Sequence, residues 1–94
     1  MQLQNHTFII SGGGSGLGAA TARLFAANGA NVVLADINEA QGNLTASAIG
    51  DQARFLKTDV TDDTSVQNAV NAAVKAFGTL HGAVNCAGVG TAER

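Results

Sequence analysis

Glycine residues crowd the segment that follows the first apolar run of the chain. The run at residues 8–10 leads at once into Gly12, Gly16 and Gly18, and an apolar pattern typical of a helix follows. A pyrophosphate reaches backbone N–H groups at a helix N-terminus only where side chains leave room, and the positive end of the helix dipole attracts it. Ser15 adds a hydroxyl at the mouth of the turn. The order of strand, glycine turn and helix therefore predicts a dinucleotide-binding βαβ unit.

An acidic residue ends the second apolar run. Asp36 follows residues 31–35 and stands 18 positions after Gly18. A carboxylate at this place accepts hydrogen bonds from the adenosine ribose hydroxyls and repels a 2′-phosphate, so it favours NAD over NADP. No Lys or Arg immediately follows Asp36. The alternative is that Asp36 caps a helix or is a solvated loop carboxylate.

A second acidic residue follows the third strand-like run, residues 53–58. The Asp59 side chain at this position can reach an adenine amino group, and the backbone N–H of Val60 can address the ring. The alternative is that Asp59 or Thr61 only caps the next helix, because short polar side chains are favoured at N-caps.

Two segments of the chain, the glycine turn and residues 85–88, resemble the short-chain dehydrogenase/reductase family. With Ser11 in front, the glycine turn reads Ser-Gly-x-x-x-Gly-x-Gly, similar to the family's Thr-Gly-x-x-x-Gly-x-Gly. Residues 85–88 resemble the family's Asn-Asn-Ala-Gly beside the cofactor, with Cys86 in place of the second Asn. Residues 83–88 look like the branch that contains type 2 3-hydroxyacyl-CoA dehydrogenases. The cofactor-binding residues that the motifs and the resemblance predict are Gly12, Ser15, Gly16, Leu17, Gly18, Asp36, Asp59, Val60, Asn85, Cys86, Ala87 and Gly88.

The resemblance also implies a reaction. A complete family member transfers a hydride between a secondary alcohol, here 3-hydroxyacyl-CoA by the local likeness, and NAD. Its later Ser and Tyr-x-x-x-Lys residues orient the substrate and move the proton. This chain contains no Tyr, so we assign no catalytic residue and expect it to be inactive alone. No activating His is placed beside Cys86 by the pattern, so we interpret Cys86 as a small apolar residue rather than a nucleophile.

Two other functions remain open on the sequence. The chain could be a non-catalytic nucleotide-binding module or a truncated remnant of the fold. It could also be a methyltransferase-type domain that binds S-adenosylmethionine at a similar glycine turn. The paired sites at Asp59-Val60 and at residues 85–88 argue against the methyltransferase.

Apolar periodicity predicts the elements that position these residues. We expect strands at 7–11, 31–35, 53–58 and 80–85, and helices at 15–28, 38–49 and 62–77. Right-handed crossovers then give a Rossmann-like, doubly wound α/β fold with a parallel sheet in the order 3-2-1-4. Ligands bind at the carboxyl ends of such strands. We expect residues 1–94 to be a single, partial NAD-binding domain.

The helices are expected to turn their apolar faces toward the sheet. Gly42 interrupts the second helix and weakens it. The residues predicted on these faces are Leu17, Ala20, Leu24 and Phe25 in the first helix, Ala40, Leu44 and Ala48 in the second, and Val66, Val70, Ala73 and Phe77 in the third.

Composition and net charge limit the kinds of partner that the chain can bind. The chain has 94 residues, of which 46% are hydrophobic and 13% charged, which indicates one small globular domain. A net charge of −2 gives no electrostatic case for nucleic acid or an acidic membrane surface. No leader or membrane-length apolar run is recognised, so we expect a cytoplasmic chain. His6 and His81 are isolated and lack metal-ligand spacing. The fourth strand would present an unpaired apolar edge, which predicts self-association.

Overall fold

The computed structural model describes residues 3–12, 14 and 16–86. The order of its elements confirms the predicted alternation of strands and helices. The elements are β1 (Thr7–Ser11), α1 (Gly16–Ala27), β2 (Asn31–Asp36), α2 (Glu39–Ile49), β3 (Ala53–Lys57), α3 (Asp63–Phe77) and β4 (Gly82–Asn85).

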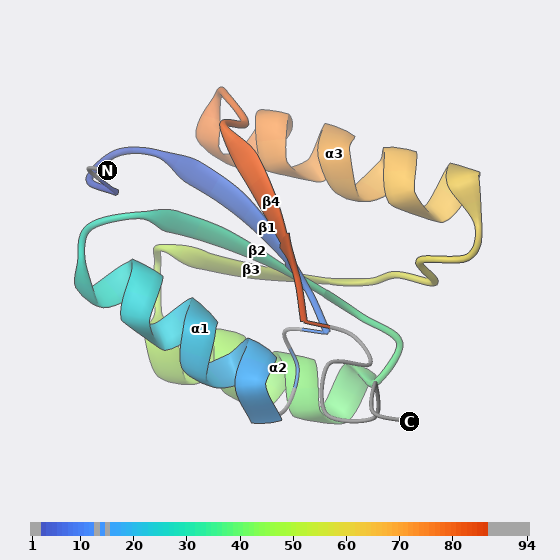
Figure 1. The fold of residues 1–94 in the computed structure, drawn as a ribbon, viewed down its shortest axis with the longest axis horizontal. Coiled ribbons are helices and arrows are strands. Elements are labelled where there is room, and N and C mark those ends of the chain that lie inside the picture. Colours follow the sequence, from blue (N-terminus) through green and yellow to red (C-terminus); the bar gives the residue numbers. More distant parts are fainter. Residues whose placement is uncertain (1–2, 13, 15, 87–94) are drawn as a thin grey trace.

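The strands form one parallel sheet in the order β3-β2-β1-β4, as predicted. Helices α1 and α2 cover one face of this sheet and α3 covers the other (Figure 1). This is the doubly wound, Rossmann-like arrangement, and it places the carboxyl ends of all its described strands at one edge of the sheet. Among the residues that the structure describes, no helix is both long and apolar enough to cross a membrane.

The core is divided by the sheet into two layers. Side chains of successive strand residues point to opposite faces, so each strand contributes to both layers. On the α3 face, Ile9 and Val33 pack with Ala73. On the other face, Ile10 and Leu34 pack among residues of α1 and β3. The middle strands are therefore buried on both sides, which explains their continuous apolar sequence.

Helix α1 packs on the sheet through a different face from the one predicted. Leu17, Ala20 and Leu24 are exposed, and the side chain of Leu24 is 61% exposed. The buried residues are small and include Ala22, while the half-buried Phe25 packs against the sheet. A helix lined with glycine and alanine can lie close to the strands. Apolar periodicity alone gave the wrong face because it does not weigh the size of a side chain.

Helix α2 also uses an unpredicted face, and Gly42 lies at its centre. The three apolar residues of the predicted face, at 40, 44 and 48, are exposed, whereas Gly42 and Thr45 are buried. A Cβ on Gly42 would overlap the ring of Phe55 from β3. The prediction that Gly42 interrupts this helix was wrong, because α2 runs unbroken from Glu39 to Ile49. The missing side chain of Gly42 makes room for Phe55. Asn38 begins the helix as its N-cap.

Helix α3 buries most of the face that was predicted for it, unlike α1 and α2. Ala73 is buried and Val70 and Phe77 are packed against the core, but Val66 is 38% exposed. Asp62 is the N-cap, and its carboxylate accepts a hydrogen bond from the N–H of Thr64 at 2.9 Å. The helix ends at a left-handed glycine, residue 78, with φ 83°.

Strand β4 is shorter than predicted and lies at an edge. It begins at Gly82 rather than at residue 80, although the N–H of His81 already donates to the Thr7 carbonyl at 2.8 Å. Within the described part of the chain, β4 pairs with β1 alone. Within this part of the chain β4 is therefore an edge strand of the sheet.

Candidate dinucleotide-binding site

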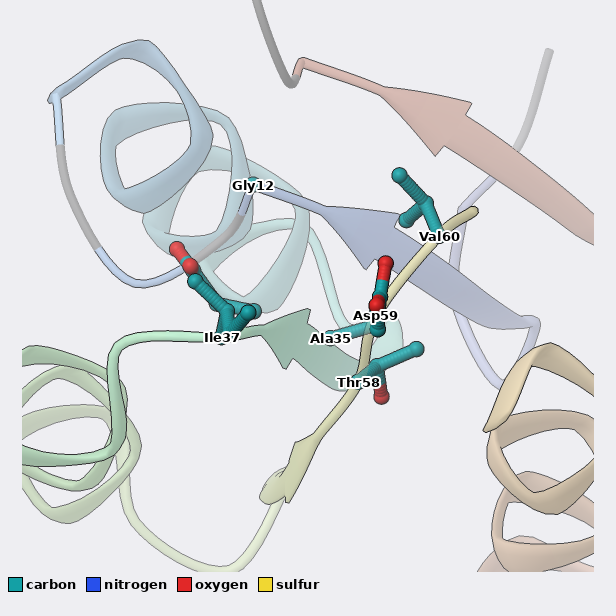
Figure 2. A pocket seen from close by; sticks show the side chains of 7 residues that line it. Gly12, Ala35, Ile37, Thr58, Asp59 and Val60 are labelled. Atoms are coloured by element: carbon teal, nitrogen blue, oxygen red, sulfur yellow. The ribbon is translucent and has the colours of Figure 1, made fainter. Parts of the chain in front are cut away.

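The carboxyl ends of β1, β2 and β3 enclose a hollow of about 150 Å³. Figure 2 shows Gly12 and Ile37 on one side of this hollow and Asp59 and Val60 on the other. Asp36 also lines it. Sites for drug-sized ligands usually span about 300–1,000 Å³, so this hollow has room for only part of such a ligand. The fold thus brings together four of the residues that the sequence predicted, from three strand ends.

The glycine turn leaves β1 through a conformation that favours glycine. Gly12 has φ 72°, and its N–H donates to the Ala35 carbonyl at 2.8 Å, which joins the end of β1 to β2. Gly16 has φ 55° at the start of α1. L-residues rarely adopt positive φ, so both positions favour glycine on backbone grounds. The first N–H groups of α1 have no intrahelical acceptor and lie at the sheet edge where the strands end.

Within α1, the predicted site residues divide by exposure. Gly18 is buried against the sheet, whereas the side chain of Leu17 is 55% exposed. Gly18 therefore serves the packing of the helix on the strands. Ser15, Ala87 and Gly88 were also predicted at the site and lie outside the described residues.

Asp36 holds two backbone groups. One carboxylate oxygen accepts from the N–H of Gly14 at 2.9 Å, and the other accepts from the N–H of Asn38 at 3.0 Å. The alternative that Asp36 caps α2 is wrong, because Asn38 is the N-cap. A carboxylate has about four lone-pair positions. Asp36 can therefore hold the turn and still accept hydrogen bonds from a ligand.

Asp59 is exposed and lies two residues after the end of β3. Its carboxylate accepts hydrogen bonds from the Thr61 hydroxyl at 2.6 Å and from the Thr61 N–H at 2.9 Å. These bonds, the hydroxyl first, lower the pKa of Asp59 below its ordinary value of 3.8. The alternative that Asp59 or Thr61 caps α3 is wrong, since Asp62 does so. Asp59 is free to present a charged oxygen to the hollow.

The residues at the end of β4 lie beside β1, away from this hollow. The Ser11 hydroxyl donates to the Asn85 side-chain oxygen at 3.3 Å, and the Cys86 N–H donates to the Ser11 carbonyl at 2.9 Å. Cys86 packs against the core layer that contains α1, and its Sγ lies 3.8 Å from the Thr21 hydroxyl. Asn85 lines a second cavity, of about 250 Å³, between α3 and the sheet. Val60 lines both cavities, so they are neighbours.

Sequence reasoning missed the contacts of Gly14 and Thr45. Thr45 is 1% exposed, and its hydroxyl donates to the Gly14 carbonyl at 3.3 Å. A polar residue three positions after Gly42 on the same helical face was the available signal. It could be used only once the buried face of α2 was known.

The two histidines are not isolated, which corrects the sequence interpretation. The rings of His6 and His81 lie 4.3 Å apart between centroids. Nδ1 of His81 accepts a hydrogen bond from the N–H of Thr7 at 3.0 Å. Both lie at the amino ends of β1 and β4, at the opposite edge of the sheet from the hollow. Pairing of β4 with β1 brings them together although they are far apart in the sequence.

Comparison with known proteins agrees with this geometry. The family model for short chain dehydrogenases matches residues 6–94. A 3-hydroxyacyl-CoA dehydrogenase type-2 of Drosophila melanogaster is 43% identical over 92 residues, which are 98% of this chain and 36% of that protein. A 2,5-dichloro-2,5-cyclohexadiene-1,4-diol dehydrogenase of Sphingobium indicum is 41% identical over 87 residues, 93% of this chain and 35% of that protein.

A solved structure is similar over most of the fold. The short chain dehydrogenase/reductase of Burkholderia phymatum in complex with NAD superposes with a TM-score of 0.84 at 32% identity. The match covers 88% of this chain and 31% of that one. The chain therefore spans about a third of the length of the relatives it matches. The glycine turn, the acidic strand ends and the match over residues 6–94 lead to one conclusion: this chain belongs to the short-chain dehydrogenase family.

Proposed function

We propose that this chain is the NAD-binding portion of a short-chain dehydrogenase. The observation that carries the proposal is the gathering of Gly12, Asp36 and Asp59 around one hollow at the carboxyl edge of the sheet. The NAD complex of the similar Burkholderia phymatum structure supports the choice of ligand. In this proposal the glycine turn and the start of α1 bind the pyrophosphate, and the hollow takes the adenosine end.

Asp36 is proposed to select NAD over NADP. Its carboxylate would accept hydrogen bonds from the ribose hydroxyls and would repel a 2′-phosphate. The charged residue nearest to Asp36 in sequence is Glu39, which pairs with Lys57 at 4.0 Å on the exposed surface. Such an exposed pair adds little net attraction for a phosphate. Asp59 and Val60 are proposed to address the adenine ring, and residues 85–88 the part of the cofactor beside β4.

The complete enzyme is proposed to transfer a hydride between a secondary alcohol and NAD. When bound, the nicotinamide supplies the hydride acceptor. The relative from Drosophila melanogaster supports a 3-hydroxyacyl-CoA substrate, whereas the relative from Sphingobium indicum is named for a cyclic diol. A secondary alcohol is the chemistry that these two names share. Because these 94 residues include no Tyr, we propose that the chain alone binds cofactor without catalysing the reaction.

Calorimetric titration of the purified chain tests this function. We expect NAD to bind at least about tenfold more tightly than NADP, because the Asp36 carboxylate would meet the 2′-phosphate. S-adenosylmethionine is the control ligand for the methyltransferase alternative, and no heat of binding is expected from it. Binding of S-adenosylmethionine in preference to NAD would overturn the proposal, and so would binding of none of the three.

A further inference from the structure

Gly14 is held on both of its backbone polar groups. Its N–H donates to Asp36 at 2.9 Å, and its carbonyl accepts from the Thr45 hydroxyl at 3.3 Å. Asp36 belongs to the end of β2, and Thr45 belongs to the second turn of α2. Two elements other than β1 and α1 therefore fix the direction of this residue in the glycine turn.

The packing around Gly14 leaves no room for a side chain. A Cβ on Gly14 would lie 2.7 Å from an Asp36 carboxylate oxygen and 3.2 Å from the backbone nitrogen of Gly42. Gly42 is itself pressed against Phe55 of β3. Gly14 of the turn thus packs against α2, and α2 packs against β3. The hydroxyl of Thr45 supplies the hydrogen bond between α2 and Gly14.

Because Thr45 is buried, water cannot replace its hydrogen bond to the Gly14 carbonyl. With 1% of its surface exposed, Thr45 has no access to bulk water as a replacement partner. A buried hydroxyl without a partner is unfavourable, so Thr45 and the Gly14 carbonyl satisfy each other. Thr45 does not line the hollow between the strand ends. The direct link from Thr45 toward the proposed site is therefore its hydrogen bond to Gly14 in the turn.

We propose that Thr45 is a positioning residue for the pyrophosphate-binding turn. Its hydroxyl and the Asp36 carboxylate together hold Gly14 in place before a ligand arrives, so the Gly14 backbone needs no reordering on binding. Preorganisation of this kind increases affinity by lowering the entropy lost on association. This inference rests on the proposed binding of a dinucleotide at the same turn.

The test compares ligands with and without a pyrophosphate. Thr45→Val keeps the shape of the side chain and removes the hydroxyl, and Thr45→Ser restores the hydroxyl. We expect Thr45→Val to weaken binding of NAD and of ADP-ribose by roughly fivefold to tenfold, the effect of one hydrogen bond. Binding of adenosine, followed by NMR, should change less than about twofold. Thr45→Ser should return all three affinities close to those of the unaltered chain.

Two further variants and one further measurement make the outcome decisive. Ser47→Ala, an exposed hydroxyl on the same helix, is the matched control and should leave every affinity unchanged. Thr45→Ala is the second hydroxyl-free variant if Thr45→Val does not fold, as judged by circular dichroism. Hydrogen exchange at the Gly14 amide should accelerate in both hydroxyl-free variants even without ligand, because the turn is less firmly held.

The outcomes separate the inference from the proposed function. Equal weakening of adenosine and NAD, or weakened NAD binding that Thr45→Ser does not restore, would overturn the positioning role. If the unaltered chain binds none of the ligands, the proposed function fails, and exchange at the Gly14 amide still decides whether Thr45 holds the turn. Unchanged exchange there would overturn the inference on its own.

Discussion

Asp36 combines a structural task with a proposed ligand-binding task. Its two oxygens already hold Gly14 and Asn38, so replacing it affects both the turn and the proposed contact with the ribose. Thr45 shares only the first of these tasks. Comparing substitutions at the two residues can therefore separate turn geometry from cofactor selection.

Replacement of Asp36 by Asn should narrow the gap between NAD and NADP. We expect Asp36→Asn to bring the two affinities within about threefold of each other, because the repulsive charge at the ribose is gone. Thr45→Val should weaken both cofactors and leave their ratio unchanged. Titration calorimetry of both variants measures this, with Asp51→Asn as a control for the charge change at an exposed site. A ratio unaffected by Asp36→Asn would contradict the proposed role.

The Thr61 hydroxyl should control the titration of Asp59. Because Thr61 lowers the pKa of Asp59, the carboxylate stabilises the fold above the unfolded-state value, and this stabilisation is lost as pH falls through the lower, folded value. Thr61→Val should raise the pKa part of the way toward 3.8 and remove the hydroxyl's share of that contribution, because the N–H of residue 61 still donates to Asp59. Carboxyl ¹³C chemical shifts followed from pH 2 to 6 give the midpoint. Thr64→Val, on an exposed helix residue, should not move it.

At the scale of elements, the contact between α2 and β3 depends on an absent side chain. Gly42→Ala should raise the helix propensity of α2 by about 1 kcal/mol, yet the new methyl group would overlap Phe55. Overpacking of this kind costs about 1–3 kcal/mol, so we expect a net loss of up to about 2 kcal/mol. Urea unfolding provides the measurement.

Two companion variants identify the cause of that loss. Asn43→Ala, at an exposed position of the same helix, should be neutral or slightly stabilising. Adding Phe55→Leu to Gly42→Ala should recover part of the lost stability, because the smaller side chain makes room for the methyl group. If Gly42→Ala alone stabilises the protein, the contact between Gly42 and Phe55 is looser than in the structure.

At the scale of the whole molecule, apolar surface remains exposed at several places. Strand β4 lies at one edge of the sheet within the described residues, and Leu17, Leu24 and Leu44 are each more than half exposed on the helices. Apolar patches and unpaired strand edges of this kind promote association between chains. The chain also spans only about a third of its relatives' length.

We expect the 94-residue chain to self-associate in solution. Sedimentation velocity at increasing concentration should show a rising weight-average mass. Ala83→Lys places a charge on the β4 edge and should shift the distribution toward monomer if edge pairing dominates. Leu24→Gln should do so if helix packing dominates. A single monomeric species at all concentrations would contradict the expectation.

The sequence by itself determined the order of the elements, the order of the strands and the placement of Gly12, Asp36 and Asp59 at strand ends. These features follow from local apolar runs, from turn glycines and from the handedness of parallel crossovers. None of them requires knowledge of which residues touch across the fold. The assignment of residues 1–94 to one partial domain stays a prediction.

Only the tertiary structure decided which helix faces are buried and what Asp36 and Thr45 hold. Alanines and glycines are spread around α1 and α2, so more than one face reads as apolar, and the distance to the sheet selects the small residues. The bonds to Gly14 join positions 22 and 31 residues apart. Such contacts depend on how each helix is rotated against the sheet, and that rotation is set by packing partners distant in the sequence.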